Sequence, residues 1–307
     1  MIQTEIGPMD GNTWEGLCQI VYKKRYSTYQ EMVPSPGDWG IEGFMLGHGI
    51  AIQCYCPKQE YDTSTLHTKQ VGKITKDLNK LKEYQNEIAS RIGDEKIKQW
   101  IFITPRIAKN HIYSHVRTKE TEVRGWNLDI LDDDFQILIH DIGHYLSEFR
   151  VIQTIRGDLL IFSESKKDSL EKTENSTEYE ENINRKNKVR SIRGGNYNLN
   201  THKRLNEITT DKFLLGDELI RKVEKQSPSL YKSLNRVINQ YENEIEEVSL
   251  TWEGTASSLL EKVSTQLKER LEKDDNIGGV IVDSDLNQIV DHIISKWIAL
   301  CPLEIDQ

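Results

Sequence analysis

The sequence predicts two domains, an N-terminal α+β (α/β) domain with a mixed sheet flanked by helices and an all-helical C-terminal domain. Three observations support this prediction. The chain has 307 residues, more than one domain usually holds. Short β-branched runs and amphipathic helical stretches alternate up to residue 162, whereas only helical spacing follows residue 205. Residues 163–204 between them are polar and basic, which is typical of a linker or mobile loop.

The elements expected in domain 1–162 follow from hydrophobic periodicity. "NTWEGLCQIVYKKRY" has one apolar helical face. "GFMLG" and "GIAIQCY" are short apolar runs separated by "GHG", which is typical of a hairpin. "STLHTKQVGKITKDLNKLKEYQNEIASRIG" predicts a long helix, and "QWIFITP" predicts a buried strand that ends at Pro105. "DDFQILIHDIGHYLSEFRVIQ" returns to helical spacing.

Domain 205–307 is expected to be helical throughout and to bind a protein partner. Its helical stretches are "TDKFLLGDELIRKVEK", "SPSLYKSLNRVINQYENEIEEV", "ASSLLEKVSTQLKERLEK" and "SDLNQIVDHIISKWIAL". From Leu205 onward there are twenty acidic and eleven basic residues, a balance of −9. Such a surface does not attract a polyanion.

Two basic regions have the opposite character. Lys69 to Arg124 holds thirteen basic and seven acidic residues, a balance of +6. Arg185 to Arg204 holds seven basic residues and no acidic one. This asymmetry predicts that the basic regions face a polyanion such as DNA.

Composition places the chain among cytoplasmic proteins with no membrane partner. No run of about 18 apolar residues is present, and "MIQTEIGPMDGN" has neither the basic nor the apolar part of a signal peptide. The four cysteines are few and scattered, and the spacing of Cys54 and Cys56 does not fit a CxxC zinc knuckle.

The hairpin region gathers the side chains that a divalent metal needs. Asp38 and Glu42 precede the first strand, and Gln53 and Tyr55 lie two residues apart on the second, hence on one face. Glu15 on the first helix offers another oxygen. Carboxylate and amide oxygens are the ligands of Mg²⁺ or Mn²⁺.

At these residues the sequence resembles the PD-(D/E)XK nuclease superfamily, particularly its type IV restriction endonuclease-like branch. The resemblance lies in "WEGLCQ", "GDWGIEG" and "IQCY", and it covers about residues 10–105. It implies a restriction-endonuclease-like sheet, with Glu42, Gln53 and Glu15 at metal-binding positions and Asp38 beside them. The same run is similar to effector subunits of ATPase-linked bacterial anti-phage systems, which implies a DNA endonuclease that works with partner subunits, including an ATPase.

Glu42 stands where the family has aspartate, and Tyr55 stands where it has a catalytic lysine. A phenol has a pKa near 10 and carries no positive charge at neutral pH. A substitute cation is therefore expected from Lys58 or from a helical stripe at spacings of four, three and four. That stripe, also expected to bind DNA phosphates, is Lys69, Lys73, Lys76 and Lys80.

Other interpretations stay open at this point. The glycines around Glu42 could serve the backbone turn alone, and the lysine stripe could be a solvated helix face. The same fold could act as an inactive DNA-binding or scaffolding subunit. "IHDIGH" places His140, Asp141 and His144 together, with His111 and His115 upstream, the pattern of a helical HD-type metal phosphohydrolase. The other interpretation of these histidines is structural, as partly buried polar residues of an amphipathic helix.

Overall fold

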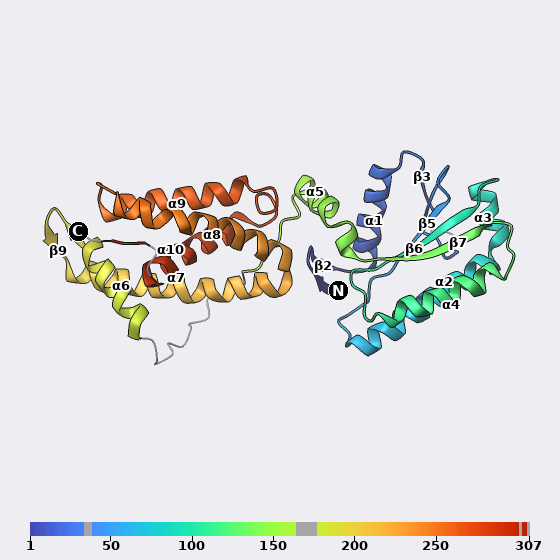
Figure 1. Cartoon of the computed structure of the whole chain (residues 1–307), viewed down its shortest axis with the longest axis horizontal. Helices are drawn as coiled ribbons and strands as arrows, with labels where there is room; N and C mark the ends of the chain where they lie inside the picture. The colour runs from blue at the N-terminus through green and yellow to red at the C-terminus, as the bar shows by residue number, and fades with distance from the viewer. Residues whose placement is uncertain (34–38, 164–176, 301–302, 306–307) are drawn as a thin grey trace. The chain divides into compact units, whose positions relative to one another are not determined.

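The computed structural model describes residues 1–33, 39–163, 177–300 and 303–305, and it divides into two compact units (Figure 1). The first unit is Met1–Ile152 and the second is Gln153–Gln307. The first contains a mixed sheet with helices, and the second is formed mainly by helices. The predicted α+β class is therefore confirmed at this level.

The first unit is built on a five-stranded sheet of order β3-β4-β5-β6-β7. β3, β4 and β5 pair antiparallel, whereas β5, β6 and β7 run parallel. The carboxyl ends of these last three strands therefore lie at one edge. The strands are β3 (Tyr29–Glu31), β4 (Gly43–Met45), β5 (Ile50–Cys54), β6 (Ile97–Ile103) and β7 (Leu131–His140).

Helices cover both faces of this sheet (Figure 1). One core cluster joins the sheet to α1 and the start of α5, and a second joins it to α2, α3 and α4. Trp14 in the first cluster and Trp100 in the second are fully buried. The helices are α1 (Gly11–Arg25), α2 (Thr63–Glu83), α3 (Gln85–Ile92), α4 (His111–Arg124) and α5 (Leu146–Arg156).

The first helix, the hairpin strands and β6 lie where the sequence predicts them. The predicted long helix is interrupted at Tyr84, where α2 ends and α3 begins. A short antiparallel pair, β1 (Ile2–Thr4) and β2 (Gly7–Met9), was not predicted.

The helical prediction for "DDFQILIH" is wrong, because these residues form β7. Phe135, Ile137 and Ile139 are buried at a spacing of two, and β7 pairs with β6 at Leu131 and again from Gln136 to His140. Leu138 is apolar as well, so the alternation is hidden in the sequence.

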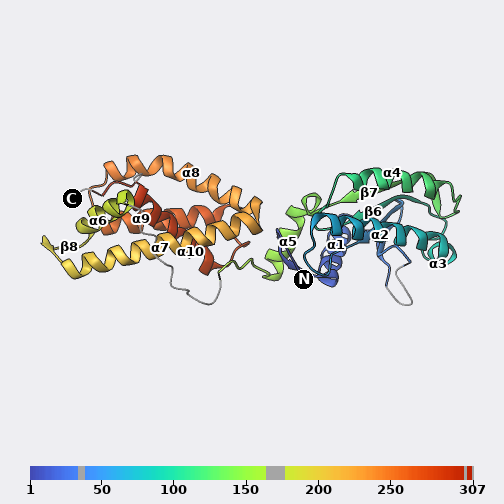
Figure 2. The ribbon, with the colours of Figure 1, turned by 90° about the horizontal axis from the view of Figure 1, so that it is seen from below.

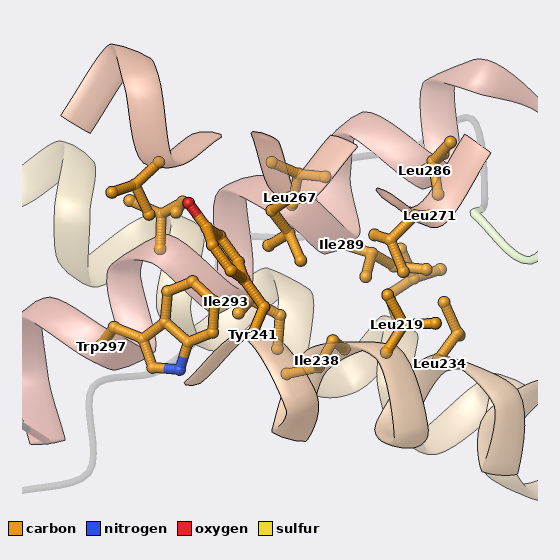
Figure 3. Packing of buried hydrophobic residues seen from close by; sticks show 14 of the residues in the cluster. Leu219, Leu234, Ile238, Tyr241, Leu267, Leu271, Leu286, Ile289, Ile293 and Trp297 are labelled. Atoms are coloured by element: carbon orange, nitrogen blue, oxygen red, sulfur yellow. The ribbon is translucent and has the colours of Figure 1, made fainter. Parts of the chain in front are cut away.

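The second unit packs its helices around one apolar core. Helix α10 lies among the others, and the ring of Trp297 meets that of Tyr241 edge-on at 5.9 Å between centroids (Figure 3). The helices are α6 (Thr177–Arg190), α7 (Leu199–Gln226), α8 (Pro228–Leu250), α9 (Ala256–Lys273) and α10 (Asp283–Leu300).

Two expectations about the middle of the chain require correction. Leu160 and Phe162 pack into the core of the second unit, so the first unit ends at Ile152 and not at residue 162. Residues 163–204 are not a linker throughout, because they contain α6, a short hairpin and the start of α7. Residues 164–176 lie outside the described part of the chain. Among the described helices, none is long and apolar enough to cross a lipid bilayer.

Candidate active site

A cavity of about 450 Å³ opens at the carboxyl end of β5. Helix α1, the turn before β4, the end of β5 with the loop after it, and helix α2 contribute its walls. It is lined by Gly11, Asn12, Glu15, Glu42, Cys54, Tyr55, Cys56, Lys58, Tyr61, Lys69 and Lys73. Several side chains that the sequence singled out therefore meet in one place.

Glu42 is held rigidly at the entrance to β4. Its backbone N–H donates to Ile52 O at 2.8 Å, and its carbonyl accepts from Met32 N at 2.9 Å. The preceding turn places Trp39 and Gly40 at positive φ, 45° and 82°. Trp100 Nε1 donates to Gly40 O at 2.9 Å, which fixes the turn against the sheet.

The Glu42 carboxylate is buried and bonded to β5. Gln53 Nε2 donates to Glu42 Oε1 at 2.7 Å, and Cys54 N donates to Glu42 Oε2 at 2.8 Å. Burial, followed by repulsion from Glu15, raises the pKa of Glu42 to about 8, although the bonds from Cys54 and the charge of Lys73 oppose the rise. A cation placed beside Glu42 would reverse this shift.

Gln53 is fully buried, and its Oε1 has no hydrogen-bond partner among the described residues. A buried carbonyl oxygen without a donor is costly, typically about 1–3 kcal/mol. Glu15 lines the same cavity and accepts from Gln19 Nε2 at 3.1 Å. Asp38, the remaining predicted ligand, lies outside the described residues.

Tyr55 lines the cavity, but it cannot supply a positive charge. Its ring stacks on Phe102 with 5.8 Å between centroids, and burial raises the pKa of its phenol above the usual 10. The side chain is therefore neutral and half-buried at the wall of the cavity.

The lysine stripe of α2 divides between two environments. Lys69 and Lys73 line the cavity, whereas Lys76 and Lys80 do not belong to its lining. Lys69 Nζ lies 4.7 Å from the centre of the Tyr61 ring. Lys58, exposed on the loop after β5, also lines the cavity.

Sequence reasoning missed Asp77, which positions Lys73. The Asp77 side chain is fully buried, and its carboxylate lies 2.7 Å from Lys73 Nζ and 3.3 Å from Lys80 Nζ. The i, i+4 and i, i+3 spacings from Asp77 to these lysines are visible in the sequence and could have identified it.

The histidine motif does not lie on an α-helix as expected, and its histidines have polar partners within the first unit. His140 ends strand β7, and Nδ1 of its ring lies 2.5 Å from the hydroxyl of Tyr145, which lies 2.6 Å from that of Tyr22. Burial and the neighbouring His144 lower the pKa of His140 to about 4. His140 is therefore neutral in a polar network of the core.

The other members of the motif do not complete a metal site. His144 Nδ1 lies 3.0 Å from Asp141 Oδ1 within one turn. His115 lies on α4 and meets Thr75 of α2 on the other face of the sheet, so it is not joined to His140. Within the described ranges no three His, Cys, Asp or Glu side chains group as metal ligands, and Asp38 is not among those residues.

Comparison of the chain with protein-family models, with curated proteins and with solved structures finds no match.

Proposed function

We propose that this protein is a metal-dependent DNA endonuclease of restriction-endonuclease-like fold that hydrolyses phosphodiester bonds in the cytoplasm. The observation that carries the proposal is the bonded pair of Glu42 and Gln53 in a cavity that also holds Glu15 and Lys73. The order of helix, antiparallel strands, helix and parallel strand supports the fold that the sequence resemblance implies.

The residues of the cavity fit a hard divalent cation, Mg²⁺ or Mn²⁺. Gln53 Oε1 is a buried oxygen without a donor in the described part of the chain, and Glu42 is a carboxylate whose ionisation is costly in its present surroundings. A bound cation would coordinate the Gln53 oxygen and would stabilise the ionised form of Glu42. Glu42, Gln53 and Glu15 would hold it, with Asp38 as a further candidate. When bound, the ion would supply charge neutralisation and activation of water.

Lys73 would supply the positive charge that Tyr55 lacks. Its ammonium group lies at the cavity wall and is ion-paired only to a carboxylate of its own helix among the described residues. It would bind the scissile phosphate and stabilise the charge that develops there. Lys58 and Lys69 would bind neighbouring phosphates, and Tyr55 would pack against a sugar or base.

The second unit would serve a different purpose. Its acidic helices would bind partner subunits of a bacterial anti-phage defence complex, an ATPase among them, as the resemblance implies. The neutral Tyr55 favours one alternative on the same fold, an inactive subunit that binds DNA without cleaving it.

Cleavage of plasmid DNA with Mg²⁺ or Mn²⁺, with and without partner subunits, tests the proposal. The Glu42→Gln variant should lose cleavage, whereas Glu87→Gln on the exposed surface of α3 and His140→Ala should keep it. Mn²⁺ should raise the melting temperature of the wild type and not that of Glu42→Gln. DNA binding without cleavage under every condition would favour the inactive subunit, and loss of cleavage through His140→Ala alone would favour an HD-type enzyme.

A further inference from the structure

The second unit carries a small, rigid hairpin between α6 and α7. Strands β8 (Ile192–Arg193) and β9 (Asn196–Tyr197) pair antiparallel and are joined by two glycines. Gly194 and Gly195 have φ values of 54° and 78°, the combination that a tight type I′ turn requires. In Figure 1 and Figure 2 the hairpin extends past the ends of both helices.

Hydrogen bonds fix the base of the hairpin to the helices. The Tyr197 hydroxyl lies 2.9 Å from His202 Nδ1, and Nε2 of that ring lies 2.8 Å from Asn184 O. Asn198 N donates to Ser191 O at 3.3 Å, and the Asn198 side chain accepts from Thr201 N to cap α7. The hairpin is therefore presented in one orientation.

The surface of this hairpin is positively charged, and several of its large apolar side chains are exposed to solvent. Lys188, Arg193 and Lys203 are exposed, and none of them has an acidic partner within the described residues. Ile192, Tyr197 and Leu199 are 45%, 47% and 53% exposed, which is high for large apolar side chains. Because the Tyr197 hydroxyl already forms a hydrogen bond, the exposed surface of its ring is the part that remains available to a ligand.

We propose that this hairpin and its flanking cations, Lys188, Arg193 and Lys203, form a contact with the backbone and groove of duplex DNA. A two-stranded ribbon fits the major groove, and a glycine tip allows close approach of the backbone. The cations bind phosphates, and the exposed aromatic and aliphatic side chains contact sugars and base edges. The acidic surface of the remaining helices confines the contact to this end of the unit.

The choice of duplex DNA rests on the proposed function, whereas the charge of the hairpin does not. The test is binding of the full-length protein to a labelled DNA duplex in EDTA, which separates binding from cleavage. The variant Lys188→Ala/Arg193→Ala/Lys203→Ala is compared with the matched variant Lys225→Ala/Lys232→Ala/Lys273→Ala, which removes three exposed cations elsewhere on the second unit.

The hairpin variant should bind more weakly, and the slope of log K against log salt should fall by about 2–3, because each lost phosphate contact contributes about 0.9. The matched variant should keep the wild-type slope, and both should keep the wild-type melting temperature. Equal weakening of the two variants, or none in either, overturns the inference. Retained DNA binding with lost binding of an acidic partner protein also overturns it. Wild-type protein that binds through the hairpin but never cleaves supports the inference and refutes only the nuclease.

Discussion

Glu42 is a buried carboxylate whose two oxygens already accept hydrogen bonds, yet its pKa is raised to about 8 from an ordinary 4.5. The folded protein therefore holds this proton more tightly than the unfolded chain does. The favourable contribution of protonated Glu42 is complete below pH 4.5 and is lost as pH rises to about 8.

Glu42→Gln should consequently stabilise the metal-free protein at pH 9 and have little effect at pH 4. The free energy of unfolding at pH 9 should rise by about 1–3 kcal/mol. This is less than the pKa shift alone implies at about 1.4 kcal/mol per pKa unit, because the substitution also removes a charge-assisted hydrogen bond. Urea unfolding in EDTA at the two pH values measures it. An equal effect at both values would show that Glu42 ionises normally.

Lys73 is the residue on which the catalytic proposal depends most. Lys73→Ala should reduce cleavage by ~10²–10³-fold, the usual cost of removing one group that stabilises developing charge. Lys76→Ala is the matched control, because Lys76 is exposed on the same helix and is not part of the cavity lining. Rates under single-turnover conditions, with Lys73→Arg as a partial rescue, separate this role from DNA binding. Equal rates for the two alanine variants would remove Lys73 from the mechanism.

Much of the cavity could be predicted from residue types. The sequence placed Glu42, Gln53 and Glu15 together because a hairpin beside a helix brings such positions into contact, and the structure does bring them together. The surroundings of Tyr55 could not be predicted, because its stacking depends on the β5–β6 register that pairs Gln53 with Phe102.

The close contact between α7 and α10 in the second unit depends on a glycine. A Cβ at Gly216 of α7 would lie 2.1 Å from the Cβ of His292 on α10, so only glycine allows these two helices to approach so closely. His292 Nδ1 also lies 2.8 Å from Phe213 O, which ties the two helices together.

Gly216→Ala should therefore destabilise the protein by about 1–3 kcal/mol through overpacking. Alanine favours a helix over glycine by about 1 kcal/mol, so propensity alone predicts the opposite sign. Gly72→Ala in α2 is the control, since a Cβ there meets nothing within 4 Å, and it should be neutral or stabilising. Thermal unfolding of both variants measures the difference, and a gain of stability in Gly216→Ala would show that α7 and α10 can separate freely.

Strand β6 could be predicted from its hydrophobic pattern, whereas strand β7 could not. β6 is a short buried run bounded by Pro105, whereas β7 continues into a turn and helix α5 with apolar residues at mixed spacing. Pairing with β6 decides its conformation, and that contact joins residues about 35 positions apart, so no local pattern reveals it.

The whole molecule consists of two units with separate cores. Each core is large enough to fold by itself. Residues 1–157, a cut that keeps helix α5 whole, and residues 158–307, expressed separately, should therefore each give a cooperative thermal transition, and the second should have the stronger helical circular dichroism. A second fragment that melts without cooperativity would show that it needs the first unit in order to fold.

The buried carboxylate of Asp77 has two lysine partners, and only one of them lines the cavity. Because this buried carboxylate has both Lys73 and Lys80 as partners, it keeps a counterion when one of them leaves. If the cavity binds a phosphate as proposed, Lys73 would turn toward it while Lys80 stays paired with Asp77, so that no unpaired anion is left in the protein interior. Under the proposed function, Lys80 would thus leave Lys73 available to exchange its carboxylate partner inside the protein for a phosphate of the substrate.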